Sequence, residues 1–298
     1  MEKEESKVAG EAALPPWVYN KWQRGAGSVS GEKKVFAGLK EELRKVIRVS
    51  GLSTKLCLYD YAADGWILLE AHRVFYPASL IKMLLLLTAL EKAEKENFSL
   101  NERHRLAESD KYAGTTRVAG TGILQFAPAG SAYTFEELLA LMMSCSDNVA
   151  TNILLERMDA EACAAAAQKY GLEKSAFTRK MYDRESEQPS NRATAYELTR
   201  MLLALQDRKA ASEALTCKGI AMLAAATDKE RIGRYIKQRA VVANKVGTVS
   251  GMVGDMALLY FPNSPPLALT AAVTNPPGQE EAAALISRLA QIIVEALR

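Results

Sequence analysis

The stretch YPASLIKMLLLLTAL, residues 76–90, places one serine and one lysine at the start of a long apolar run. Pro77 is well placed to open a helix, because a proline at the first helical position gives up an N–H that has no partner there. The run is too short to span a membrane, and it is bounded by Lys82 and Glu91. We therefore predict a buried helix that begins near Ser79.

The serine and the lysine of this stretch are three residues apart, so a helix would bring both to one face. An amine buried among the leucines that follow should lose its charge more easily than a free lysine. A neutral Lys82 could then accept the proton of Ser79 and create a nucleophile. The pattern Ser-x-x-Lys occurs by chance in many proteins, so its meaning depends on the rest of the chain.

Strand patterns lie on both sides of the helical block that begins at this serine and continues to about residue 226. Before the block, the sequence predicts a helix over 33–49 and strands over 54–60 and 66–70, joined by an Asp64-Gly65 turn. After the block, it predicts strands over 241–245, 255–261 and 267–274 and a last amphipathic helix over 279–297. Within the block, Thr134 and Glu137 form a capping box that opens a helix through Met143, and further helices are expected over 149–157, 160–169, 194–206 and 212–225.

This order of elements predicts an α/β fold of the α+β type. The first and last strands would pair in one antiparallel sheet of about five strands, flanked by the terminal helices, with an all-helical subdomain as a separate layer. Residues 1–31 are expected to be a disordered or loosely docked lead-in, and 32–298 a single domain. In that domain the sheet part is 32–75 with 228–298 and the helical part is 76–227, so a site is expected in the seam between them.

Two more polar clusters fall near this seam. Ser146-Asp147-Asn148 follows a predicted helix; such residues cap helices, but a hydroxyl, a carboxylate and an amide are also catalytic groups. Lys245-Val246-Gly247-Thr248 ends an apolar strand, where glycine permits close approach of a substrate backbone and the lysine could attract an anion. The structural alternative for the second cluster is an edge-strand lysine followed by a bulge.

Taken together, Ser-x-x-Lys, Ser-Asp-Asn and Lys-x-Gly in this order resemble the motif set of class A β-lactamases and penicillin-binding proteins. The resemblance covers residues from about 33 to 298, and the stretches GTGILQ (120–125) and SDNVATN (146–152) share it. It implies a β-lactamase/transpeptidase-like fold and a serine hydrolase that works through an acyl-enzyme.

The resemblance also implies a role for each matching residue. Ser79 would be the acylated nucleophile, Lys82 the general base, and Ser146 the group that carries the proton to the leaving nitrogen. Asn148 would bind the acyl amide of the substrate, and the segment Lys245, Gly247 and Thr248 would bind its carboxylate side. The backbone N–H groups of Ser79 and Thr248 would form an oxyanion hole, where loss of one donor typically costs about 10²–10³ in rate.

The chain departs from the family pattern at two places. Val246 stands where the family has a threonine, which removes a hydrogen bond worth about 1.5–3 kcal/mol to a charged group. No Glu-x-x-Leu-Asn occurs in the stretch 181–191, where the family carries the glutamate that activates the deacylating water. Glu185 and Glu187 are the nearest candidates, and the alternative is that both are solvated loop carboxylates.

Composition narrows the classes of function. The net charge of +3 and the lack of a basic stripe with aromatics predict no nucleic-acid partner. The two histidines, which lack metal-ligand spacing, argue against a Ser-His-Asp triad and against a metal site, and no cofactor is implied. Arg231 and Arg234 either face an anionic ligand or, as we favour, lie on the surface of a connecting segment.

The expected substrate is a small β-lactam or an acyl-peptide, bound by a monomer without a membrane span. The resemblance implies an extracytoplasmic (periplasmic or secreted) localisation. The charged segment 1–10 lacks the pattern of a signal peptide, so a cytoplasmic localisation is the alternative. The favoured function is hydrolysis of β-lactams as a class A β-lactamase. The alternatives are a D-alanyl peptidase or esterase, or a penicillin-trapping sensor, each with slow deacylation.

Overall fold

The computed structural model describes residues 14–20, 30–95 and 98–298. Its α-helices are α1 (Ser30–Ser50), α2 (Lys82–Glu94), α3 (Phe135–Ser144), α4 (Asn148–Met158), α5 (Ala160–Lys169), α6 (Ala195–Gln206), α7 (Glu213–Ala224) and α8 (Gln279–Leu297). The strands of its large sheet are β1 (Ser53–Asp60), β2 (Gly65–Leu69), β7 (Val241–Val249), β8 (Met252–Phe261) and β9 (Ser264–Thr274). Most predicted elements agree with these bounds to within a few residues.

Among the residues that the structure describes, the large sheet has five strands in the order β2-β1-β9-β8-β7, and every pair is antiparallel. The first strand of the chain lies beside the last, with Ser53 opposite Thr274 and Asp60 opposite Leu267. The predicted pairing of the first and last strands is therefore confirmed. It places β7, with its Lys-x-Gly segment, at one edge of the sheet.

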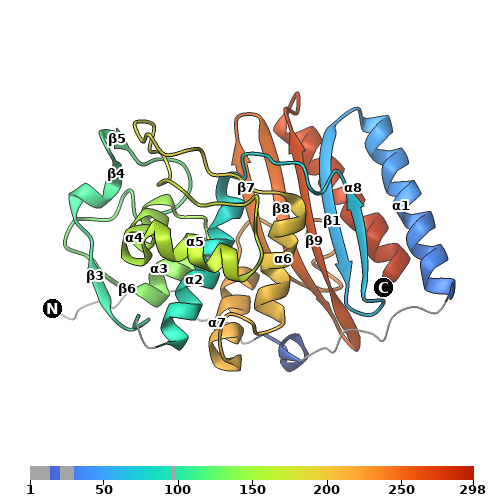
Figure 1. Cartoon of the computed structure of the whole chain (residues 1–298), viewed down its shortest axis with the longest axis horizontal. Coiled ribbons are helices and arrows are strands. Elements are labelled where there is room, and N and C mark those ends of the chain that lie inside the picture. Colours follow the sequence, from blue (N-terminus) through green and yellow to red (C-terminus); the bar gives the residue numbers. More distant parts are fainter. Residues whose placement is uncertain (1–13, 21–29, 96–97) are drawn as a thin grey trace.

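The two faces of the sheet are covered by different sets of helices. Figure 1 shows α1 and α8 side by side on one face and the helical layer, α2 to α7, on the other. On the first face, Leu43, Leu259 and Ile286 are fully buried in one apolar cluster. Burial of both faces explains why β8 is apolar along most of its length, with each of its residues buried.

Helix α2 runs through the middle of the helical layer. Each residue from Lys82 to Leu90 is buried, and the helix contacts α3, α4, α5, α6 and α7. A helix that is apolar around its whole circumference is stable only when other elements surround it. The buried helix predicted from residues 76–90 is confirmed, and it brings its polar start, next to Ser79, to the seam with the sheet.

The structure adds elements that the pattern did not predict. The helical layer also holds two short ladders, β3 (Arg103–Arg105) with β6 (Ala132–Thr134) and β4 (Tyr112–Ala113) with β5 (Thr116–Arg117). The 3₁₀ turns are η1 (Pro16–Tyr19), η2 (Ala78–Ile81) and η3 (Glu108–Lys111). These ladders and turns have two to four residues each, too few for a periodic pattern to be read from sequence.

Part of the predicted lead-in packs on the helical layer. Val18 of η1 is fully buried in the core cluster of that layer, and the Arg208 guanidinium donates to the Tyr19 carbonyl at 3.0 Å. Residues 1–13 and 21–29 of the lead-in lie outside the described residues. In the part that is described, no helix is both long enough and apolar enough to cross a membrane.

Candidate active site

A pocket of about 390 Å³ opens in the seam between the helical layer and the edge of the sheet. Three of the residues predicted from sequence line it: Ser79, Asn148 and Thr248. The others lie directly behind these three, as the contacts below show. A larger pocket of about 810 Å³ lies along α5 and residues 171–178, and none of the predicted site residues lines it. The seam pocket is therefore the candidate active site.

Ser79 lies in the 3₁₀ turn η2, immediately before α2, where its side chain is half-buried at the pocket wall. The preceding Ala78 has φ of 46°, in the left-handed region that side chains other than glycine seldom adopt. Such strain persists only where the surroundings fix it and is common at functional sites. Here it turns the backbone so that the serine stands at the entrance of α2.

Lys82 is fully buried, and its ammonium nitrogen contacts the Ser-Asp-Asn segment. Its Nζ lies 2.9 Å from the Ser146 carbonyl, 3.1 Å from Ser146 Oγ and 2.8 Å from Asn148 Oδ1. Burial, and next the positive charge of Lys245, hold the pKa of Lys82 well below its usual range. An amine that is neutral keeps a lone pair, which the Ser146 hydroxyl can donate to, and it can serve as a base.

The Ser-Asp-Asn segment forms the turn that starts α4. The Asp147 carboxylate caps this helix by accepting from the Ala150 N–H at 2.9 Å. It also accepts from the N–H groups of Ile123 and Leu124 at 2.7 and 2.9 Å, so it points away from the pocket and braces the 120–125 loop. The two interpretations of this segment therefore apply to different residues. Asp147 caps the helix, whereas Ser146 contacts Lys82, as the catalytic interpretation requires.

Along β7, alternate side chains face opposite sides of the sheet. Lys245 and Gly247 face the helical layer: a Cβ on Gly247 would lie 2.9 Å from both Leu80 Cγ and the Pro77 carbonyl oxygen. Only glycine therefore lets β7 pack this tightly on η2. Burial lowers the pKa of Lys245 to about 7, and its Nζ donates to the carbonyl of Val246 at 3.0 Å.

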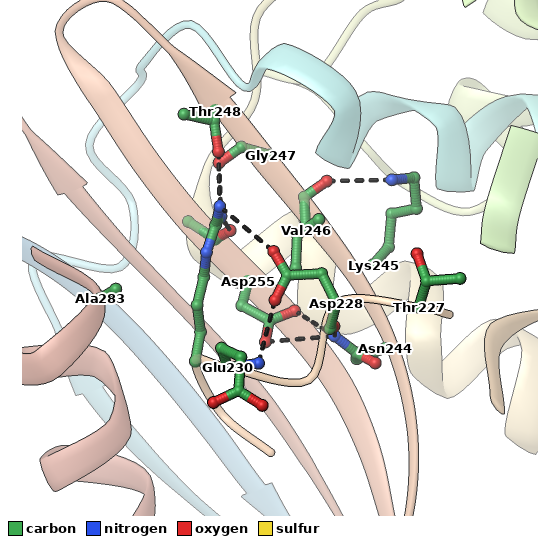
Figure 2. Close-up of polar contacts among 12 residues, drawn as sticks. Thr227, Asp228, Glu230, Asn244, Lys245, Val246, Gly247, Thr248, Asp255 and Ala283 are labelled. Atoms are coloured by element: carbon green, nitrogen blue, oxygen red, sulfur yellow. Dashed lines mark hydrogen bonds and ion pairs between the residues drawn. The ribbon is translucent and has the colours of Figure 1, made fainter. Parts of the chain in front are cut away.

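Arg231 holds the end of β7 from the face opposite Lys245. Its guanidinium donates to the carbonyls of Gly247 and Gly254, at 2.8 and 2.5 Å, and to Thr248 Oγ1 at 2.5 Å. Figure 2 shows this group of contacts around Gly247 and Thr248. The expectation that Arg231 is a surface arginine is wrong, because it is only 9% exposed. The expectation is right for Arg234, which is exposed and pairs with Glu230 at 3.5 Å.

The sequence analysis did not predict a cluster of buried polar side chains beside β7, formed by Lys229, Asn244 and Asp255. Asn244 Nδ2 donates to Asp255 at 3.1 Å, and the Ile232 N–H donates to the same carboxylate at 3.1 Å, as the dashed lines in Figure 2 mark. Lys229 Nζ donates to Asn244 Oδ1 at 2.8 Å. Burial raises the pKa of Asp255 to about 7. A single Asp within the apolar strand pattern of β8 was the signal that could have revealed this group.

The segment 179–184 forms the remaining wall of the pocket. Glu185 and Glu187, the candidates for a deacylating base, are exposed and do not line the pocket. Glu185 instead accepts from the N–H and hydroxyl of Thr115. The acidic residue that does line the pocket is Asp183, and its Oδ1 accepts from the Ser186 N–H at 2.9 Å.

Comparisons with known proteins agree with this geometry. A family model described as the Beta-lactamase enzyme family matches residues 38–297. No curated protein matches the chain by sequence. Solved structures with the same fold include a beta-lactamase from Sphaerobacter thermophilus DSM 20745, 24% identical with a TM-score of 0.79, covering 88% of this chain and 97% of its own.

Two further solved structures extend the comparison. A mutant of PBP-A, solved as an acyl-enzyme complex with penicillin G, is 21% identical with a TM-score of 0.78, covering 87% of this chain and 96% of its own. A beta-lactamase from Chitinophaga pinensis DSM 2588 is 17% identical with a TM-score of 0.80, covering 88% and 100%. At these identities the structures establish the fold that the sequence predicted.

Proposed function

Because the chain belongs to the Beta-lactamase enzyme family, we propose that it is a serine hydrolase that opens β-lactams through an acyl-Ser79 intermediate. The contact of the fully buried Lys82 amine with Ser146 and Asn148, one turn from Ser79, carries the proposal. A mutant of the similar PBP-A forms an acyl-enzyme with penicillin G, which is the chemistry proposed here.

In the proposed reaction, neutral Lys82 accepts the Ser79 proton as the serine oxygen attacks the lactam carbonyl. The N–H groups of Ser79 and Thr248 would stabilise the oxyanion, and Asn148 would bind the acyl amide. The proton then passes through Ser146 to the departing nitrogen, and the ring opens. The 3.1 Å contact between Lys82 Nζ and Ser146 Oγ supports this transfer, because it is within hydrogen-bonding distance.

The substrate carboxylate would lie against Lys245 and Thr248. Arg231 fixes the Thr248 hydroxyl from behind the strand, so this hydroxyl points in one direction before the substrate arrives. Val246 offers no hydroxyl there, and Thr248 with its arginine would supply the missing hydrogen bond. Gly247 contributes by keeping the strand close to Ser79.

Deacylation distinguishes the second candidate function from the first. Glu185 is held by Thr115 outside the pocket, and the Asp183 carboxylate already accepts loop N–H groups. Without a positioned base the acyl-enzyme would persist, as in a D-alanyl peptidase, an esterase or a penicillin-trapping sensor. This observation favours slow release of β-lactams over rapid turnover.

The test is intact-protein mass spectrometry over time after addition of benzylpenicillin, with Ser79→Ala as the control. A Ser79-dependent adduct that disappears as product accumulates would support the β-lactamase. An adduct that persists would support the second candidate. If neither protein gains mass and no product forms, the proposal of β-lactam acylation is wrong.

A further inference from the structure

The segment 179–184 of the pocket wall is rich in positive charge. Arg179, Lys180, Asp183 and Arg184 line the pocket, so three cationic side chains stand against one anionic side chain on this segment. None of these residues has a part in the acylation chemistry proposed above. The excess of positive charge therefore needs a separate explanation.

Two buried asparagines hold this segment over the pocket. Asn191 Oδ1 accepts from the Arg179 N–H at 3.1 Å, and its Nδ2 donates to the Arg179 carbonyl at 3.1 Å. Asn152 of α4 makes the same pair of bonds with Met181, at 2.7 and 3.0 Å. Because both asparagines are only 2% exposed, the segment has a fixed path, and its side chains have a defined place at the pocket.

The charged side chains of this segment differ in the partners that they already have. Lys180 forms an ion pair with Glu156, and Arg179 donates to Ser190 Oγ at 2.9 Å. Asp183 accepts from two loop N–H groups. Arg184 is exposed, and among the residues that the structure describes its guanidinium has no hydrogen-bond or ion-pair partner. Arg179 keeps its charge too, because a hydroxyl does not neutralise it, but in the described part of the chain the Arg184 guanidinium is the one on this wall without such a contact, so it can turn to a ligand at the least cost.

The segment borders the part of the site that would hold the acyl group. A Cβ placed on Gly120 would lie 2.7 Å from the Tyr182 hydroxyl and 3.0 Å from Asn148 Nδ2, so Tyr182 stands beside the amide-binding asparagine. The carboxylate side of the substrate, by contrast, would meet Thr248 and Lys245. Arg184, which lines the same wall two residues after Tyr182, would therefore face a different portion of the substrate.

On the basis of the proposed function, we infer that the site prefers acyl donors whose acyl side chain carries a second anionic group, and that Arg184 determines this preference. A β-lactam with a carboxylate on its side chain fits this description, as does an acyl-peptide with an acidic residue before the scissile bond. The attraction acts across partly exposed space, so we expect an effect of about fivefold, near the upper end for exposed charge pairs.

The test compares two probes that differ by one carboxylate, benzylpenicillin and carbenicillin, in the rate of Ser79 acylation measured by intact mass. Arg184→Gln should lower the rate with carbenicillin about fivefold more than the rate with benzylpenicillin. Arg184→Lys should keep most of the preference, because the charge remains. Raising the salt concentration from 0.05 to about 0.5 M should reduce the preference in the unmodified protein.

Arg48→Gln is the matched control, since this exposed arginine of α1 lies on the opposite face of the sheet. It should leave the ratio of the two rates unchanged. Equal losses with both probes in Arg184→Gln, or no loss with either, would overturn the inference while Ser79 acylation stands. An absence of any Ser79-dependent adduct with both probes would instead remove the proposed function, and the inference with it.

Discussion

At the scale of single residues, the proposed chemistry depends on a lysine that is shielded from solvent. Lys82 has no exposed surface, and its nitrogen has three oxygen neighbours within 3.1 Å, all from the Ser146–Asn148 segment. A charged ammonium in this position would be poorly solvated and would lie near a second buried lysine, Lys245. Both effects favour the neutral amine, which is the form that the proposed activation of Ser79 requires.

Replacement of Lys82 by methionine should abolish this activation. Met has nearly the same length and volume but no basic nitrogen, so we expect the acylation rate of Ser79 to fall by about 10²–10⁴, the usual contribution of a general base. The measurement is the rate of adduct formation with benzylpenicillin by intact mass. The matched control is Lys92→Met, in the same helix but away from the pocket. An unchanged acylation rate in Lys82→Met would exclude Lys82 as the base.

At the scale of elements, the site depends on the distance between β7 and η2. The strand approaches the turn so closely that Gly247 has the Pro77 carbonyl and the Leu80 side chain as neighbours. Arg231 fixes the same end of the strand by binding the carbonyls of Gly247 and Gly254. The strand end that carries Thr248 is thus held from both faces of the sheet.

A methyl group at this contact should separate the two elements. Gly247→Ala places a Cβ 2.9 Å from backbone oxygen and side-chain carbon, so we expect destabilisation of about 1–3 kcal/mol from overpacking. Acylation should also slow, because Thr248 moves away from Ser79. Urea unfolding and the acylation rate measure the two effects. The control is Gly38→Ala, at an open position of α1, where stability should rise instead. If the Gly247→Ala protein is as stable as the parent, the close contact does not have the role described.

At the scale of the whole molecule, stability depends on buried titratable groups below the sheet edge. Asp255 is fully buried, with Arg231 and Asp228 as charged neighbours and Asn244 and Ile232 as hydrogen-bond donors. Burial raises its pKa to about 7, above the value near 4 of an unfolded chain. Its contribution to stability is therefore fully present below about pH 4 and is lost as the pH rises through about 7.

The variant Asp255→Asn should remove this dependence. Between pH 5 and pH 8 the free energy of unfolding of the parent protein should fall, relative to the variant, by about 2–3 kcal/mol. Lys245 and Lys229 have lowered pKa values and act in the opposite direction. The Asp255 charge raises both of these pKa values, so the difference between the two proteins reports on Asp255 together with its coupling to the two lysines. Urea unfolding at both pH values checks the difference, with Glu295→Gln as a surface control. A difference between the two proteins that does not change with pH would contradict the raised pKa.

Several features of this protein followed from the sequence alone. Periodicity placed the main helices and strands, because burial on one face or on all faces leaves a repeat along the chain. The three motifs in order indicated Ser79, Lys82 and Ser146, since each motif carries its reactive groups within a few residues. The pairing of the first and last strands followed from the order of the elements.

Tertiary structure decided what depends on contacts between distant residues. Arg231 looked like a surface arginine because its partners, the carbonyls of Gly247 and Gly254, are backbone atoms and leave no side-chain signal in the sequence. Whether Asp183 or Glu185 lines the pocket likewise depends on the path of their loop. Asn152 of α4 holds this loop by two hydrogen bonds to the backbone of Met181. Local patterns determine which elements form, whereas the packing of the layers determines which charges are buried and which side chains reach the pocket.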